Sequence, residues 1–241
     1  MTVAYDGTEF FGFQKQSSAP TVQGELERAI AVVTGEASDI VGAGRTDAGV
    51  HALGQVVHFE SNWPGPIDRL AVVLCSKLDR AVVVRHACVA ADGFHARYSA
   101  RFRRYGYSFL SGGSPNPLSQ RFAFRTSGSL RFDRMRAAAS TLEGVHDFGA
   151  FVTGVGSAEQ ICAVRCVQSV SWAHRGVVWL FMVQADGFLR HMVRNIVGYL
   201  LLVGEETMSV EEFARLLEPG HGEKSVRQAP ACGLCLLRVG Y

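Results

Sequence analysis

The chain contains 241 residues, of which 48% are hydrophobic and 19% are charged, and its formal net charge is only +2. A chain with this many apolar side chains is globular rather than disordered, and its length suits one large domain or two small ones. The longest apolar run in a helical pattern, 196–203, is far shorter than the roughly 20 residues that cross a bilayer, so we expect no membrane partner.

In the first hundred residues the apolar pattern predicts two helices with strands around them. Apolar residues recur at helical spacing between Pro20 and Gly35, and Thr21 is the expected N-cap. The β-branched run 82–84 predicts a strand. A second helix is predicted by apolar residues at the same spacing, which are Ile67, Leu70, Ala71, Leu74 and Leu78.

The middle of the chain has the same alternation of strands and helices. Aromatic residues alternate along 103–110, which predicts a strand, and apolar residues recur at helical spacing over 132–142. Two strand-like runs flank 174–176 and predict a hairpin. Antiparallel strands alternating with helices favour an α+β fold with helices on one face of a sheet.

The last part of the chain predicts two more helices and a closing strand. A long helix is expected over 188–203. Ser209 and Glu212 form a capping box for the next helix, which should end near Pro219. Residues 234–239 read as the final strand.

The densest signal in the sequence is the glycine-rich segment 42–55. Glycines at this density indicate backbone that bends sharply or lets a ligand approach closely. A dinucleotide-binding loop is excluded, because the third glycine of G-x-G-x-x-G would fall at Asp47, whose charge repels a pyrophosphate. A P-loop is excluded as well, because no Gly-Lys-Ser or Gly-Lys-Thr follows.

What remains is a carboxylate, Asp47, on a tight loop with Arg45 two residues upstream and His51 four residues downstream. A nearby guanidinium would hold the acid ionised at neutral pH, as a nucleophile or a charge stabiliser requires. The alternative is that Asp47 only caps its own loop through the backbone, as aspartates commonly do. The residues alone leave both interpretations open.

Arginine outnumbers lysine heavily, and part of the arginine is interleaved with aromatic residues. A planar guanidinium binds phosphate and stacks on bases, so such a cluster suits a nucleic-acid surface. A solvated strand edge is the alternative. The cluster comprises Arg97, Tyr98, Arg101, Arg103, Arg104, Tyr105 and Tyr107.

The segment 44–52, Gly-Arg-Thr-Asp-Ala-Gly-Val-His-Ala, resembles the signature loop of the tRNA pseudouridine synthase A family, and the resemblance extends over nearly the whole chain. Phe13 departs from the family, which usually has tryptophan there, and other residues usually occupy the positions of Cys232 and Cys235. The further matching segments, in the same order as in the family, are 5–8, 11–14, 21–27, 94–100, 104–105, 147–151 and 188–198.

The resemblance implies an RNA isomerase without a cofactor or metal, which converts uridine to pseudouridine at positions 38 to 40 in the anticodon stem-loop of tRNA. Asp47 would be the catalytic carboxylate, Arg45 would act on the substrate, and Tyr105 would lie against the target base. Arg194, on a helix with apolar neighbours, needs a counter-ion or acceptors, and the resemblance points to Asp47. Candidates for contact with tRNA are Arg97, Arg101, Arg104 and Arg190.

The resemblance also implies the architecture and the assembly. It implies two similar ferredoxin-like α/β halves joined in one mostly antiparallel sheet, with helices on one face and a central RNA-binding cleft. Residues 1–100 would carry the catalytic loop, and residues 101–241 would complete the cleft. A homodimer is implied, with tRNA as its partner.

A single carboxylate distinguishes this chemistry from ordinary glycoside hydrolysis, which needs two carboxylates. The nearest acids in the sequence are Asp39 and Glu60. Asp47 could attack the nucleotide or assist the loss of a sugar proton, and both routes stay open. The competing function is a catalytically silent RNA-binding or RNA-remodelling protein on the same fold, although such a protein gains nothing from an acid aimed at phosphates.

The cysteines bear on the compartment and on metal binding. The sequence opens without a charged-then-apolar leader, so we expect the reducing cytoplasm and free thiols. The pairs 162/166 and 232/235 leave a zinc site open as an alternative, but both fall at predicted strands, where buried cysteine is usually a small hydrophobe. The six cysteines are Cys75, Cys88, Cys162, Cys166, Cys232 and Cys235.

Overall fold

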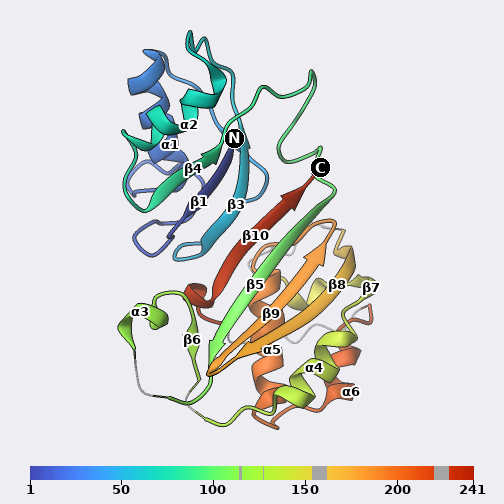
Figure 1. The fold of residues 1–241 in the computed structure, drawn as a ribbon. Coiled ribbons are helices and arrows are strands. Elements are labelled where there is room, and N and C mark those ends of the chain that lie inside the picture. Colours follow the sequence, from blue (N-terminus) through green and yellow to red (C-terminus); the bar gives the residue numbers. More distant parts are fainter. Residues whose placement is uncertain (114–115, 127, 154–161, 220–227) are drawn as a thin grey trace. The chain divides into compact units, whose positions relative to one another are not determined.

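The computed structural model describes residues 1–113, 116–126, 128–153, 162–219 and 228–241. The chain divides into two compact units, shown in Figure 1: unit 1 comprises Met1–Arg101 and Cys235–Tyr241, and unit 2 comprises Phe102–Leu234. The sequence predicts a boundary between the halves at residue 100, next to Arg101, where the first stretch of unit 1 ends. The final strand was expected in the second half, but its residues Cys235–Tyr241 group with unit 1.

Unit 1 is a small sheet with two helices. Its strands lie in the order β4-β1-β3-β10, and β2 pairs with β3. β1 is antiparallel to both β3 and β4, whereas β10 is parallel to β3. The elements are β1 (Thr2–Tyr5), α1 (Val22–Thr34), β2 (Val41–Gly42), β3 (His51–His58), α2 (Ile67–Cys75), β4 (Val82–His86) and β10 (Leu234–Gly240).

Local signals at its two ends set the bounds of α1. The Thr21 hydroxyl accepts a hydrogen bond from Gly24 N, and Gly35 ends the helix in the left-handed region at φ 79°. Both features match the sequence prediction. α2 also begins where expected but ends at Cys75, about one turn before Leu78.

A buried carboxylate ties α1 to two neighbouring segments. Glu27 is 8% exposed, and its oxygens accept hydrogen bonds from Lys15 Nζ (2.7 Å), Gln23 Nε2 (2.8 Å) and Ile40 N (3.3 Å). Burial alone would raise the pKa of Glu27, but these donors together outweigh it and hold the pKa below its ordinary value. Glu27 is therefore expected to stabilise unit 1 in its charged form.

We expect Glu27→Gln to lower the free energy of unfolding by about 1–3 kcal/mol at pH 7, because the donors lose a charged acceptor. A lowered folded-state pKa means that this stabilisation is complete above the unfolded pKa of about 4.3 and is lost as the pH falls through the folded value. Urea unfolding at pH 7 and about pH 3 should therefore show the difference shrinking in acid. Glu9→Gln, at an exposed position, is the control. Equal stability of Glu27→Gln and wild type at pH 7 would refute the role.

Unit 2 contains strands in the order β5-β9-β8-β7, with β6 beside β5. β8 and β9 form the predicted hairpin, with Arg175 opposite Val178. The mixed α+β class and the mostly antiparallel pairing predicted from the sequence are confirmed. The elements are β5 (Phe102–Leu110), α3 (Pro117–Gln120), β6 (Phe124–Arg125), α4 (Phe132–Ser140), β7 (Gly144–Asp147), η1 (Gly149–Phe151), β8 (Val164–Arg175), β9 (Val178–Ala185), α5 (Met192–Gly204), α6 (Val210–Arg215) and η2 (Ala231–Gly233).

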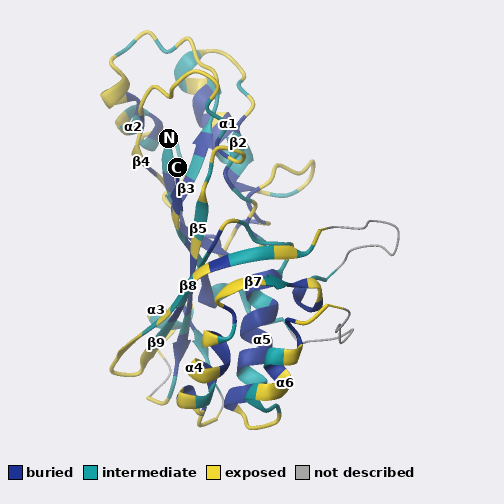
Figure 2. Cartoon of the chain, turned by 90° about the vertical axis from the view of Figure 1, so that its right-hand side faces the viewer, coloured by how far each residue is buried: buried dark blue, intermediate teal, exposed yellow. Residues whose placement is uncertain are grey.

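Helices α4, α5 and α6 pack against one another on one face of the unit 2 sheet (Figure 1). Most of α5 is buried, which Figure 2 shows in dark blue. α6 has the predicted capping box, in which Ser209 and Glu212 exchange hydrogen bonds, but it ends at Arg215 and does not reach Pro219.

The predicted start of α5 is wrong. The helix begins at Met192 and not at Phe188, because the preceding residue, His191, has φ 61°, a left-handed conformation that interrupts the helix. Phe188 instead packs edge-on against Tyr105, with 5.1 Å between ring centroids. The apolar residues at 188–189 have the spacing expected of a helix. Phe188 is apolar because it packs against Tyr105 on β5, and not because it belongs to α5.

Membrane and metal features can be stated for the described residues alone. None of their helices is long and apolar enough to cross a membrane. All six cysteines are free thiols. Within the same ranges, no three His, Cys, Asp or Glu side chains gather as the ligands of a metal ion would.

Candidate active site

Asp47 lies in unit 1, on the loop between β2 and β3. Val50 N donates to Asp47 O over 3.1 Å and closes a tight turn, with Gly49 at φ 76°. Along this loop Thr46 is buried, Asp47 is half-buried and Arg45 is exposed. The carboxylate is thus not sealed inside unit 1, as a catalytic role requires.

The loop is anchored to the last residue of β1 and to the segment that follows β1. A buried hydrogen bond of 2.8 Å joins Tyr5 OH to the hydroxyl of Thr46. Phe13 N donates to Thr46 O over 3.0 Å, and Gly49 N donates to Phe10 O over 3.3 Å. The residues on either side of Asp47 are therefore fixed by contacts that are distant in sequence.

The start of the loop is held separately by β3. Ala43 N donates to Val56 O over 2.8 Å, and the fully buried Gln55 donates from Nε2 to Gly44 O over 2.7 Å. Gly44 directly precedes Arg45, so the hydrogen bond from Gln55 fixes the backbone from which the exposed Arg45 side chain extends.

Glycines at positions 7 and 12 allow the segment after β1 to lie directly against the backbone of the loop that carries Asp47. A Cβ atom on Gly7 would lie 2.0 Å from Val50 O, and one on Gly12 would lie 2.8 Å from Thr46 O. Gly12 also has φ 93°, which side chains disfavour. The glycines of 5–8 and 11–14, recognised in the sequence as family motifs, thus serve the loop that carries Asp47.

His51 and Asp6 complete this support. His51, buried at the start of β3, accepts a hydrogen bond at Nδ1 from Gly7 N over 3.1 Å. The Asp6 carboxylate lies 3.2 Å from the same nitrogen and accepts two hydrogen bonds from Thr8. These contacts assign His51 a structural role at the end of the loop.

We expect Gly12→Ala to lower turnover by about 10–100-fold, because a methyl group against Thr46 O displaces the loop, and a shift of about 1 Å in a reacting group has this order of effect. Gly35→Ala is the matched control, since Gly35 also has positive φ but nothing lies within 4 Å of its added Cβ. Gly35→Ala carries similar backbone strain without the clash, and thermal unfolding reports the folded fraction of each variant, on which the activities are compared. Equal activity of the two variants would contradict the role of Gly12.

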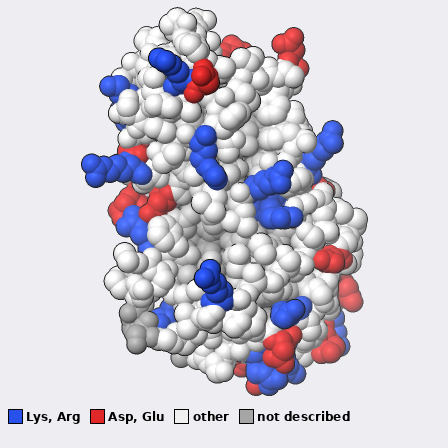
Figure 3. Space-filling model, in the orientation of Figure 1, with Lys and Arg blue, Asp and Glu red and all other residues white. Residues whose placement is uncertain are grey.

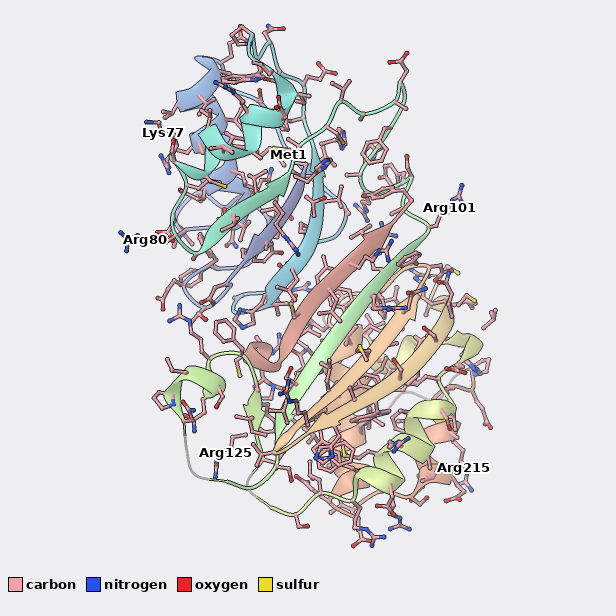
Figure 4. All side chains as sticks on the ribbon, in the orientation of Figure 1. Met1, Lys77, Arg80, Arg101, Arg125 and Arg215 are labelled. Carbon is pink, nitrogen blue, oxygen red and sulfur yellow. The ribbon has the colours of Figure 1, made fainter. Side chains whose placement is uncertain are left out.

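Two of the predicted tRNA contacts lie at the end of unit 1. The Arg97 guanidinium lies 5.6 Å from the centroid of Tyr98, which is 76% exposed and stacks on His95 at 4.4 Å. Arg101 donates its backbone N–H to Gly240 O, and its exposed side chain extends outward (Figure 4). Both arginines are therefore placed at the surface.

The other two predicted contacts lie in unit 2. Arg104 is exposed on β5 and donates from Nε to Gln184 on β9, over 3.0 Å. Arg190 is exposed but precedes α5, so the prediction that it lies one helical turn before Arg194 is wrong. On the face drawn in Figure 3, Lys and Arg side chains are scattered among uncharged surface and form no single dense patch.

Tyr105 lies on β5 in unit 2 and is 8% exposed. Its neighbours in alternation, Tyr107 and Phe109, are fully buried, and Tyr107 OH donates to Pro230 O over 2.9 Å. Tyr105 is itself buried, as a core tyrosine beside Tyr107 and Phe109 would be. Tyr105 lies at the margin of the core, where Phe188 supports its ring edge-on.

Arg194 lies in the first turn of α5 and is half-buried. Its Nε donates to Ala229 O over 2.9 Å, and Ala229 N donates to Arg194 O over 3.1 Å. The predicted need for an acceptor is confirmed. The predicted pairing with Asp47 joins residues of different units and stays a prediction.

Comparison with known proteins decides the family. A family model described as tRNA pseudouridine synthase matches residues 1–99 and 138–241. A protein of Acetivibrio thermocellus named tRNA pseudouridine synthase A is 40% identical over 241 residues, covering 100% of this chain and 98% of that protein. The chain belongs to the tRNA pseudouridine synthase family. The relative of the same name in Moorella thermoacetica is 39% identical, over 100% of this chain and 98% of its own length.

The two kinds of comparison differ over the middle of the chain. The model of the tRNA pseudouridine synthase family leaves residues 100–137 unmatched, and these include Arg101, Arg104 and Tyr105. The relatives above align across this stretch, since they cover the whole chain. A chain of a solved Cbf5-Nop10-Gar1 complex covers 84% of this chain and 45% of its own length at 12% identity, with a TM-score of 0.39 that is too low to add to the argument.

Several residues that support the site were not assigned a role from the sequence. Tyr5, Gly12 and Thr46 lie in segments that carry the resemblance to the tRNA pseudouridine synthase family, but their contacts join positions about 30 to 40 residues apart. Thr153 and Gln228, which contact His191 in unit 2, lie within 138–241 but outside the shorter segments that carry the resemblance in the sequence. No periodicity or motif marked them.

Proposed function

We propose that this chain converts uridine to pseudouridine in tRNA, with Asp47 as the catalytic carboxylate. The observation that carries the proposal is a half-buried carboxylate on a turn fixed on both sides, in a member of the tRNA pseudouridine synthase family. If Asp47 only capped its own loop, the buried hydrogen bonds that hold Thr46 and Gly44 would not be needed.

The reaction breaks the bond between N1 of the base and C1′ of the sugar and forms a bond from C5 to C1′. The C5 proton leaves to solvent and N1 gains a proton, so the change is an isomerisation without an oxidant or a second substrate. An ionised Asp47 serves either by attack on the nucleotide or by removal of a sugar proton. Both routes need the same acid at the same place.

The remaining site residues take roles that follow from the family. Tyr105 would offer its ring to a uracil that has left the stack, which costs a few kcal/mol without such a partner. Arg45, exposed beside Asp47, would occupy the gap left in the RNA. Arg194 would pair with Asp47 and keep it ionised. Arg97, Arg101, Arg104 and Arg190 would meet phosphates.

The finer substrate and the assembly belong to the same proposal. The target uridines would be positions 38 to 40 in the anticodon stem-loop, and a homodimer in the cytoplasm would hold the tRNA. Exposed arginines such as Arg97, Arg101 and Arg104 suit this substrate, because phosphate contacts position an RNA without reading its sequence.

Release of tritium from tRNA labelled at uridine C5 tests the function. The isomerase releases tritium into water in proportion to pseudouridine formed, because C5 loses its hydrogen when it joins the sugar. A catalytically silent RNA-binding protein would retain all tritium while binding the tRNA. Binding without release under single-turnover conditions would therefore establish the second function.

A further inference from the structure

A polar cluster in unit 2 joins three segments of the chain. Thr153 Oγ1 lies 2.7 Å from His191 Nδ1, and Gln228 Nε2 lies 2.7 Å from Thr153 Oγ1 and 3.0 Å from the same imidazole nitrogen. An amide nitrogen can only donate, so the Thr153 hydroxyl accepts a hydrogen bond from Gln228. The same hydroxyl donates its own hydrogen bond to His191 Nδ1. Because Gln228 Nε2 can only donate to His191 Nδ1 as well, this ring nitrogen acts as an acceptor.

This cluster is continuous with the segment that holds Arg194. Gln228 is followed by Ala229, whose carbonyl accepts from Arg194 Nε and whose N–H donates to Arg194 O. His191 is the N-cap residue of α5, three residues before Arg194, in the left-handed conformation described above. Thr153 thus contacts both His191, which lies three residues before Arg194 in the chain, and Gln228, which directly precedes the acceptor residue Ala229.

The position of Thr153 is itself fixed from the helix. The fully buried Asn195 donates from Nδ2 to Phe151 O over 2.8 Å, and Asn195 N donates to His191 O over 3.0 Å. The segment 151–153 is therefore held at two points of the first turn of α5. Thr153 joins that turn to Gln228.

We propose that Thr153, His191 and Gln228 are positioning residues that orient the guanidinium of Arg194. The hydrogen bond from Nε to Ala229 O fixes one edge of a planar group, and this fixes the direction of its remaining donors. The hydrogen bond to Thr153 fixes Gln228 and thereby the neighbouring Ala229. The carbonyl of Ala229 in turn fixes the plane of the Arg194 guanidinium. This inference rests on the proposed function, in which Arg194 meets the catalytic carboxylate.

Thr153→Val removes the hydroxyl and keeps the shape of the side chain. We expect it to lower the single-turnover rate on bound tRNA by about 10–100-fold, as expected for a displaced reacting group. The Kd for tRNA should change by less than about threefold, because many phosphate contacts set it. Thr153→Ser restores the hydroxyl and should recover the rate to within about threefold of wild type.

Thr141→Val is the matched control. Thr141 is also half-buried in unit 2, and its hydroxyl donates over 2.7 Å to Ala138 O at the end of α4. It should keep the wild-type rate. Gln228→Leu is a second test of the cluster, expected to lower the rate as Thr153→Val does, and thermal unfolding of each variant reports the folded fraction.

A double-mutant cycle separates positioning from general stability. If Thr153 acts through Arg194, Thr153→Val should cause almost no further loss in an Arg194→Lys background. Additive losses, or Thr153→Val and Gln228→Leu proteins within twofold of the wild-type rate, would overturn the proposal. Wild-type protein that binds tRNA without turnover would instead refute the proposed function, so the two failures are distinguishable.

Discussion

Asp47→Asn is expected to reduce pseudouridine formation at least about 10⁴-fold, the order of loss found when an essential catalytic carboxylate becomes an amide. Asparagine keeps the size of the side chain but can act neither as a nucleophile nor as a base. The anchors of the loop run through Thr46, Gly44 and Gly49, so the fold of unit 1 and the affinity for tRNA should be retained. Single-turnover tritium release with excess protein measures the loss.

Asp39→Asn is the control for this experiment. Asp39 is the preceding acidic residue in the sequence, lies in unit 1 and is exposed. It should keep wild-type activity and stability. An Asp47→Asn protein that is folded, binds tRNA and turns over within tenfold of wild type would show that another group performs the chemistry.

Arg194→Lys is expected to lower kcat/KM by about 10²–10³-fold, the range seen when a preorganised donor is removed from a reaction centre. Lysine keeps the charge but lacks Nε and the planar fork, so Ala229 O loses its donor and the cation is no longer held in a fixed plane. Steady-state kinetics on tRNA transcripts measures the loss. If Arg194 acts on Asp47, the change should add little to the loss caused by Asp47→Asn.

Arg215→Lys is the matched control, since Arg215 lies on α6 in the same unit and its side chain is exposed at the surface (Figure 4). It should leave kcat/KM unchanged. Activity of Arg194→Lys within threefold of wild type would remove Arg194 from the site, and with it the reason for the Thr153 cluster.

The elements that local chemistry specifies were predictable from the sequence. Thr21 and Gly35 mark both ends of α1, and Ser209 with Glu212 marks the start of α6. The β8–β9 hairpin follows from two strand-like runs around 174–176. In each case the signal and the structure lie within a few residues of one another.

Elements set by distant contacts were not predictable in the same way. Nothing near β10 indicates that it lies parallel to β3, with Cys235 opposite His51, and so belongs with unit 1. Phe188 has the spacing of a helix residue, but its contact with Tyr105 and the left-handed His191 place it outside α5. Tertiary contacts outweigh local pattern at these positions.

The candidate site shows the same division. Glycine density and the charge of Asp47 drew attention to 42–55, and the resemblance to a family supplied the chemistry. The contacts that hold the loop, from Tyr5 to Thr46 and from Gly49 to Phe10, join distant residues of types that occur throughout the chain. Thr153 and Gln228 carry no signal in the sequence, and only their distances to His191 identify them.

Mapping pseudouridine in an unmodified tRNA transcript after incubation with purified wild-type protein tests the central claim most directly. We expect pseudouridine at the uridines of positions 38 to 40, and unchanged uridine at the same positions after incubation with Asp47→Asn. Unchanged uridine throughout, from wild-type protein that demonstrably binds the transcript, would contradict the isomerase and leave an RNA-binding protein.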